Sequence, residues 1–178
     1  MKIRKTDIEG LIILEPKVFG DSRGNFFESY HKIRLEEHGL FYDFVQDNQS
    51  HSSFGVIRGL HYQKAPYAQA KLIRVMEGVI FDVAVDLRPG SSTYGQWFGL
   101  EISAKNHLQL LIPEGFAHGF SVLSPQATVF YKCNTYYHPE SETGIRFDDP
   151  DLQINWNIDL KSAVISEKDR NLPYFKYL

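Results

Sequence analysis

The chain has 178 residues and a formal net charge of −3, with 43% hydrophobic and 14% aromatic residues. These values are typical of one globular domain and argue against a strongly basic nucleic-acid-binding protein, a disordered chain or a membrane span. Cys133 is the single cysteine, so no internal disulfide forms, and the first ten residues are too charged for a signal peptide. We therefore expect a cytoplasmic domain that spans residues 1–178.

Short apolar and aromatic runs separated by turn residues predict a series of β-strands. The runs cover residues 11–19, 24–30, 56–62, 71–76, 79–87, 94–103, 108–113, 119–123 and 128–133. Within the fifth run, Asp82 and Asp86 alternate with apolar residues, which is the pattern of a half-buried strand.

Residues 31–38 and residues 159–169 are the two segments expected to contain helix. Helices do not alternate with strands, so a parallel sheet is not expected. The sequence predicts an all-β, antiparallel fold, either a sandwich or a jelly-roll barrel, with short peripheral helices.

The first candidate site is the run at residues 58–63, with sequence RGLHYQ. Regular strand alternation places Arg58 on the face opposite His61 and Gln63. The alternative interpretation is a surface strand with a solvated arginine and a histidine that only satisfies its own hydrogen bonds.

The second candidate site is residues 112–120, IPEGFAHGF, where a tight turn leads into a strand expected to begin at His118. This turn is similar to the second motif of the cupin superfamily, in which the histidine is usually a metal ligand. The first cupin motif needs a second histidine where this chain has Gln63, and a nearby ammonium at Lys71 would repel a cation. We expect no metal; a pocket with His61, Lys71 and His118 suits an anion or a developing oxyanion.

Two other residues have both structural and functional interpretations. Tyr131 is either a core aromatic or a phenol that points into the barrel. Asp169 lies in a charged run near the C-terminus, and such runs are ordinarily solvated.

Six segments of the sequence follow one another in a characteristic order. They are residues 21–28 (DSRGNFFE), 46–48 (QDN), 55–63 (GVIRGLHYQ), 85–88 (VDLR), 112–120 (IPEGFAHGF) and 166–169 (SEKD). In this order, and over about residues 3–173, the chain strongly resembles the dTDP-4-dehydrorhamnose 3,5-epimerase family. The resemblance implies an antiparallel jelly-roll (cupin-like) barrel that forms a homodimer and uses no cofactor and no metal. It also implies epimerisation of dTDP-4-dehydro-6-deoxy-D-glucose at carbons 3 and 5 to dTDP-4-dehydro-L-rhamnose.

The matching motifs also imply roles for individual residues. His61 would be the base, Asp169 would orient it, and Tyr131 would deliver a proton from the opposite face of the sugar. Lys71 would stabilise the enolate oxygen. The implied substrate-binding residues, besides Lys71, are Arg23, Phe26, Glu28, Gln46, Asn48, Arg58, His118, Tyr137, Glu142 and Lys168. The two arginines would hold the diphosphate, Tyr137 would stack on thymine, and Arg23 would come from the partner subunit.

Three alternatives remain open at this point. An epimerase that acts at carbon 3 or carbon 5 only would share most of these residues. A metal-dependent cupin enzyme and a non-catalytic nucleotide-sugar-binding jelly roll are the other two. In every case we expect one domain with N-terminal strands available for dimerisation and a C-terminal helical extension.

Overall fold

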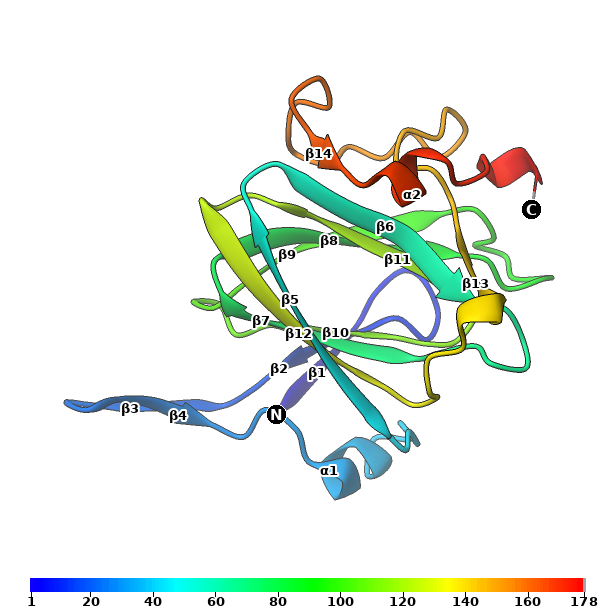
Figure 1. Cartoon of the computed structure of the whole chain (residues 1–178). Helices are drawn as coiled ribbons and strands as arrows, with labels where there is room; N and C mark the ends of the chain where they lie inside the picture. The colour runs from blue at the N-terminus through cyan, green and yellow to red at the C-terminus, as the bar shows by residue number, and fades with distance from the viewer. Residues whose placement is uncertain (178) are drawn as a thin grey trace.

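The computed structural model describes residues 1–177, so the last residue of the expected 1–178 domain lies outside the described part. Short strands dominate it (Figure 1). The elements are β1 (Lys2–Lys5), β2 (Ile12–Glu15), β3 (Val18–Asp21), β4 (Gly24–Phe27), α1 (Lys32–Glu36), β5 (Gln46–Ser53), β6 (Val56–Gln63), β7 (Lys71–Glu77), β8 (Val79–Asp86), β9 (Trp97–Ser103), β10 (Gln109–Ile112), β11 (Phe116–Val122), β12 (Gln126–Cys133), η1 (Pro139–Ser141), β13 (Glu142–Gly144), β14 (Val164–Ile165), α2 (Glu167–Arg170) and η2 (Phe175–Tyr177).

Two sheets face each other as the layers of a jelly roll (Figure 1). The first layer has the strand order β1-β2-β10-β7-β12-β5, and the second has the order β13-β6-β11-β8-β9. Neighbouring strands in both layers run antiparallel, whereas the short β14 adds to β6 in parallel. The β3–β4 hairpin projects away from both layers. The predicted antiparallel all-β fold with few short helices is therefore confirmed.

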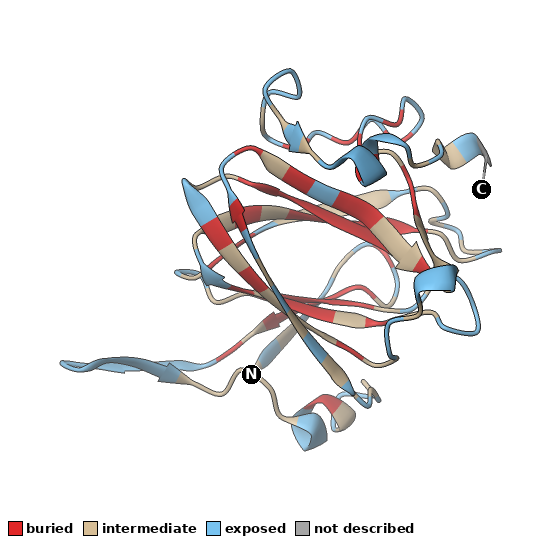
Figure 2. Ribbon diagram, viewed as in Figure 1, coloured by how far each residue is buried: buried red, intermediate tan, exposed pale blue. Residues whose placement is uncertain are grey.

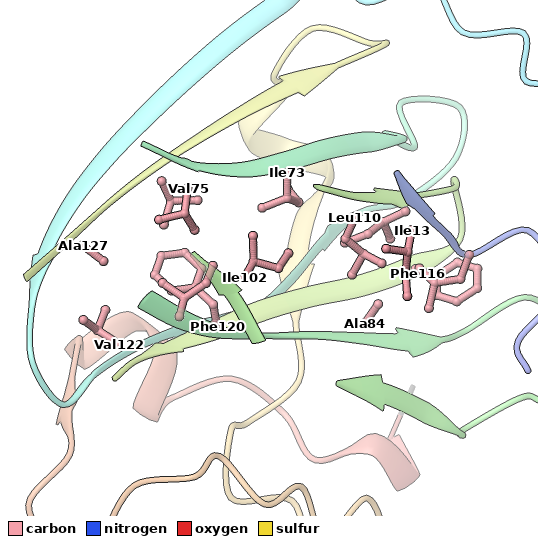
Figure 3. Close-up of a cluster of buried hydrophobic side chains, with 14 of the residues drawn as sticks. Ile13, Ile73, Val75, Ala84, Ile102, Leu110, Phe116, Phe120, Val122 and Ala127 are labelled. Atoms are coloured by element: carbon pink, nitrogen blue, oxygen red, sulfur yellow. The ribbon is translucent and has the colours of Figure 1, made fainter. Parts of the chain in front are cut away.

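The main core fills the space between the layers (Figure 3). Ile73 and Leu110 point inward from the first layer, and Ala84, Phe116 and Phe120 point inward from the second. Full burial of an Ile, Leu or Phe side chain stabilises the fold by roughly 1.5–3 kcal/mol. Packing across the layers thus fixes the strands that carry the polar residues of the barrel interior.

The C-terminal segment covers the outer face of the second layer (Figure 1). Ile145 and Trp156 from this segment pack against Val83 of β8. Both faces of β8 are consequently buried, and Asp82 and Asp86 are fully inaccessible to solvent. The prediction of a half-buried strand is wrong here, because a sequence pattern alone does not show that a later segment covers one face.

Two other expectations differ from the structure. The strand β5 was not predicted, because its sequence is polar; it is an edge strand of the first layer and pairs with β12 over its full length. Residues 159–169 were expected to form one or two helical turns; one turn is present, α2 at the end of the segment, and the unpredicted strand β14 precedes it. The side chain of Ser166 caps that turn by accepting a hydrogen bond from the backbone N–H of Asp169 at 3.0 Å. No helix in the described part of the chain is long and apolar enough to cross a membrane.

Candidate active site

A cavity of about 300 Å³ lies between the two layers. Strands β5, β7 and β12 form its wall in the first layer, and β6 and β13 form the wall in the second. Its lining residues are Gln46, Asn48, His61, Tyr62, Gln63, Gln69, Lys71, Tyr131, Tyr137 and Glu142. Seven residues predicted for the site therefore meet in one cavity, although they are spread over almost 100 positions of sequence.

A bulge in β6 sets the direction of His61. His61 lies opposite His118 of β11, whereas Arg58 lies opposite Phe120, and the register shifts between these two pairs. Because His118 and Phe120 lie on one face of β11, Arg58 and His61 share a face too. The predicted alternation, which separated Arg58 from His61, is wrong because it assumed a regular strand.

A close approach of two glycines permits this bulge. Gly59 has a φ of +119°, a conformation that favours glycine, and a Cβ at this position would lie 2.6 Å from the Cα of Gly119. The backbone N–H of Gly59 donates to Asp169 Oδ2 at 3.0 Å. The bulge and the C-terminal segment are thus joined at the site.

Asp169 also holds His61 directly. His61 Nε2 lies 2.8 Å from Asp169 Oδ1, across 108 positions of sequence. Burial alone would raise the pKa of the Asp169 carboxyl, but the hydrogen bonds and charge of His61 and the N–H of Gly59 outweigh burial and lower that pKa. With the carboxylate accepting from Nε2, a neutral His61 ring keeps Nδ1 free to accept a proton.

The opposite wall carries an ammonium and a phenol. Lys71 on β7 and Tyr131 on β12 come from the first layer, whereas His61 comes from the second. Burial lowers the pKa of the Lys71 ammonium, while the nearby Cys133, Asp82 and Glu142 oppose that shift. Burial raises the pKa of the Tyr131 phenol, so this group keeps its proton at neutral pH.

His118 forms a second histidine–aspartate pair, deeper in the barrel. The strand was predicted to begin at His118. It begins at Phe116, so His118 lies inside β11. His118 Nε2 lies 2.7 Å from Oδ1 of Asp82, whose Oδ2 is buried without a hydrogen-bond partner. Sequence reasoning gave Asp82 no role, because it assigned Asp82 to the more polar face of a half-buried strand, whereas the structure buries this residue inside the barrel. Within residues 1–177, no three His, Cys, Asp or Glu side chains gather as a metal ion would require.

At the outer end of the cavity, three side chains are linked by hydrogen bonds. The Tyr137 hydroxyl donates to Glu142 Oε2 at 2.6 Å, and Lys168 Nζ donates to the same oxygen at 2.5 Å. Burial alone would raise the pKa of Glu142, but these two donors lower it, so the group is a carboxylate. Gln46 accepts a hydrogen bond from the Tyr137 backbone N–H and donates to Asn48 at 3.0 Å.

A second hollow of about 440 Å³ adjoins this site. It is lined by Val56, Ile57, Arg58, His61, Val164, Ile165, Ser166, Lys168 and Asp169. The Arg58 guanidinium donates to Ser52 Oγ at 3.0 Å and lies within this hollow. The predicted Arg58 and Lys168 are thus next to His61 without lining the main cavity.

Three predicted residues lie on or next to the β3–β4 hairpin and line neither the main cavity nor the adjoining hollow within one chain. Arg23 and Phe26 line a separate hollow of about 480 Å³ on the β3–β4 hairpin. The Arg23 side chain is 87% exposed and forms an ion pair with Asp21 on the same hairpin. Glu28 follows the hairpin and pairs with Arg34 of α1 at 2.9 Å.

Three residues of the cavity were missed: Tyr62, Gln63 and Gln69. Gln63 lies in the predicted motif and on the face that alternation assigned to His61, so the pattern contained a signal for it. Gln69 lies in a loop without regular pattern, and nothing in the sequence singles it out.

The chain is similar to known proteins over nearly its full length. A family model described as dTDP-4-dehydrorhamnose 3,5-epimerase matches residues 5–177. The dTDP-4-dehydrorhamnose 3,5-epimerase of Methanothermobacter thermautotrophicus is 52% identical over 94% of this chain and 90% of its own length. The crystal structure of dTDP-4-dehydrorhamnose 3,5-epimerase from Elizabethkingia anophelis is 52% identical, with a TM-score of 0.96 over 99% of this chain and 97% of that chain.

A structure with a bound nucleotide sugar is also similar. The crystal structure of dTDP-6-deoxy-D-glucose-3,5-epimerase from Legionella pneumophila, in complex with dTDP-4-keto-L-rhamnose, is 49% identical. Its TM-score is 0.95, and the match covers 99% of this chain and 94% of that chain. Because the family model spans nearly the whole chain and about half of the residues are identical in these relatives, the chain belongs to the dTDP-4-dehydrorhamnose 3,5-epimerase family.

Proposed function

We propose that His61 and Tyr131 carry the proton transfers of a 3,5-epimerisation from opposite walls of the cavity. The activity of the chain is that of its family: it is an isomerase that acts on a dTDP-linked 4-keto-6-deoxy sugar. The observation that carries the residue assignment is the origin of the two groups, since His61 belongs to one layer and Tyr131 to the other. A sugar ring between the layers would meet a base on one face and an acid on the other.

The substrate's own ketone makes the reaction possible. In dTDP-4-dehydro-6-deoxy-D-glucose, the carbonyl at carbon 4 acidifies the hydrogens on carbons 3 and 5. Removal of either hydrogen gives an enolate, and return of a proton to the other face inverts that carbon. The carbon skeleton is neither oxidised nor reduced, so inversion at both carbons gives dTDP-4-dehydro-L-rhamnose without a redox cofactor.

His61 is suited to remove the proton. Asp169 accepts a hydrogen bond from Nε2, fixes the orientation of the ring and stabilises the imidazolium that forms. Lys71 on the opposite wall supplies a positive charge for the enolate oxygen. Loss of a comparable preorganised donor costs on the order of 10²–10³ in rate.

Tyr131 is suited to return the proton. Its raised phenol pKa keeps it protonated until the enolate forms. Each inversion leaves one proton on His61 and removes one from Tyr131, so both groups exchange protons with water before the next inversion. The hydrogen found on the inverted carbon therefore comes from solvent.

The remaining assigned residues bind the nucleotide and the sugar. Arg58 is placed to bind the diphosphate, and the exposed ring of Tyr137 to stack on thymine. The other proposed contacts to base or sugar are Phe26, Glu28, Gln46, Asn48, His118, Glu142 and Lys168. The support for these contacts is the match of the sequence motifs to the family.

We also propose a homodimer in which each cavity receives Arg23 from the partner. The β3–β4 hairpin carries exposed apolar rings, with Phe26 71% exposed and Phe19 53% exposed, and it stands clear of the body (Figure 2). A two-fold symmetric pair would bury these rings and bring a guanidinium to the diphosphate. The single domain would then use its N-terminal strands for dimerisation.

Mixing two inactive variants tests the dimer. Arg23→Ala and His61→Ala chains are each expected to be inactive alone, whereas a mixture that exchanges subunits regains part of the activity. One class of heterodimer site then combines His61 of one chain with Arg23 of the other. If subunits exchange and no activity returns, Arg23 does not act across an interface.

We propose that the chain works in the cytoplasm. Its one cysteine, Cys133, is a buried free thiol, which a reducing compartment preserves. The nucleotide-sugar substrate class supports the same placement.

The function is tested by incubating the full chain with dTDP-4-dehydro-6-deoxy-D-glucose in D₂O and following the reaction by NMR. We expect deuterium at carbons 3 and 5 and the L-rhamno product. Deuterium at one carbon only would indicate a single-site epimerase, and no exchange would indicate a binding protein. Stoichiometric iron, zinc or manganese, with activity lost on chelation, would indicate a metal-dependent cupin enzyme instead.

A further inference from the structure

We propose that Gln63 is a positioning residue that fixes Tyr137 at the nucleotide end of the cavity. Gln63 lines the cavity together with Tyr137 and Glu142, and it is only 5% exposed. The inference rests on the proposed function, because it assumes that Tyr137 contacts the nucleotide. It assigns Gln63 a role in nucleotide affinity and no direct contact with the substrate.

The side-chain amide of Gln63 makes three hydrogen bonds to the backbone, two of them on either side of Tyr137 and one to Tyr67. Its Nε2 donates to the carbonyl oxygen of Tyr136 at 3.3 Å, and its Oε1 accepts from the N–H of His138 at 2.7 Å. The second hydrogen on Nε2 goes to the carbonyl oxygen of Tyr67 at 2.6 Å. Since a glutamine amide has two donor hydrogens, no donor remains for a base or a sugar.

This amide determines where the Tyr137 ring lies. Tyr137 lies between the two peptide groups that the Gln63 amide binds. Its own N–H donates to Gln46 Oε1 at 2.8 Å. Gln63 is also opposite Glu142 in the strand register, and Glu142 accepts a hydrogen bond from the Tyr137 hydroxyl. One buried residue therefore joins the backbone of Tyr137 to β6, and the neighbouring strand β13 carries the side-chain partner of Tyr137.

A second tie joins the same loops outside the cavity. The rings of Tyr67 and His138 stack with centroids 3.8 Å apart and an angle of 7° between their planes. Lys64 donates its N–H to the carbonyl oxygen of Ser141 at 2.9 Å. The loop after β6 thus supports the segment that contains Tyr137.

The end of the cavity that contains His61 is fixed by contacts that do not depend on Gln63. His61 is fixed by Asp169, which binds the N–H of Gly59 and belongs to the C-terminal segment. None of these contacts involves the Gln63 amide. Displacing the Tyr137 segment is therefore expected to weaken nucleotide binding while proton transfer at bound substrate continues.

The test uses Gln63→Glu, which keeps the shape and the acceptor oxygen but replaces the Nε2 donor with an oxygen that faces two carbonyls. We expect the Kd for dTDP, measured by calorimetry, and the KM to rise about tenfold or more. The kcat is expected to stay within about threefold of the original value. The matched control is Gln126→Glu at the far end of β12, which should change none of these constants.

A double-mutant cycle with Tyr137→Ala shows whether Gln63 acts through Tyr137. If it does, Gln63→Glu weakens dTDP binding much less in the Tyr137→Ala background than alone. Full additivity, an unchanged Kd for Gln63→Glu, or a loss confined to kcat would each overturn the inference. Tyr137→Ala with unchanged dTDP affinity would instead overturn the proposed nucleotide contact itself.

Tyr67→Ala keeps the proposal testable if Gln63→Glu does not fold. Tyr67 is 39% exposed, and removal of its ring leaves its carbonyl in place while abolishing the stack on His138. We expect the same direction of change, with the Kd for dTDP raised about threefold and the kcat unchanged. An unchanged Kd for this folded variant would contradict the supporting role of the loop.

Discussion

Two histidine–aspartate pairs stand side by side in this barrel, and only one of them has access to the cavity. The distances are almost equal, 2.8 Å for His61–Asp169 and 2.7 Å for His118–Asp82. The His61 side chain is 28% exposed, whereas that of His118 is 8% exposed. The same chemical pair can therefore provide the proposed base in one place and, in the other, a buried pair that stabilises the fold beneath the proposed sugar contact of His118.

The origin of the two carboxylates explains this difference. Asp82 comes from β8, next to β11 in the same sheet, so the pairing of these two strands brings Asp82 next to His118. Asp169 comes from the C-terminal segment and reaches its histidine from outside the sheet, at the bulge near Gly59. A carboxylate that the C-terminal segment holds beside β6 leaves the cavity side of His61 open, and this is the arrangement that a base requires.

The largest expected effect comes from His61→Asn. Removal of the proposed base should lower kcat by about 10²–10⁴, because positioned general bases contribute on this order. Steady-state assays measure this loss, and calorimetry with dTDP should show unchanged affinity. Near-normal turnover would remove His61 from the mechanism.

Asp82→Asn should affect stability more than any exposed aspartate does. Replacement of the buried carboxylate disturbs its hydrogen bond with His118, and an unsatisfied buried polar group costs about 1–3 kcal/mol. Urea denaturation measures the change, and Asp148→Asn, which breaks a more exposed ion pair with Arg146, serves as the control. Equal losses in the two variants would contradict the structural role assigned to the inner pair.

Asp169→Asn should affect activity more than stability. An asparagine amide donates where the carboxylate accepts, so the His61 ring loses its orienting partner and the imidazolium loses a counter-charge. We expect kcat to fall about 10–10²-fold, less than for His61→Asn, because the imidazole itself remains. A kcat equal to that of the original chain would show that the outer pair has no functional advantage over the inner one.

The smallest effect is a dependence of stability on pH. The pKa of Asp169 is lowered in the folded chain, so its contribution is present above the unfolded value of about 3.9 and is lost as pH falls through the folded pKa. The difference in unfolding free energy between the original chain and Asp169→Asn should hold from pH 7 to pH 5. It should shrink below about pH 4 in urea titrations. Loss of this difference already at pH 6 would contradict the lowered pKa.

Local pattern was enough to predict the antiparallel fold and both histidine motifs, because alternation and turn residues act over a few positions. It was not enough for the bulge, which depends on Gly59 and Gly119 meeting from different strands. The contact of His61 with Asp169 spans 108 residues and came only from the family resemblance. The burial of Asp82 depends on the packing of both layers, which no single strand pattern encodes.

The central claim is that one wall of the cavity supplies the base, His61, and the opposite wall supplies the acid, Tyr131. Deuterium exchange in D₂O tests this claim most directly. With dTDP-4-dehydro-6-deoxy-D-glucose, Tyr131→Phe is expected to exchange some carbon-bound hydrogen for deuterium, through His61, while forming little or no inverted product. His61→Asn is expected to give neither exchange nor inversion. If Tyr131→Phe inverts both carbons at the original rate, another group is the acid and the division between the walls is wrong.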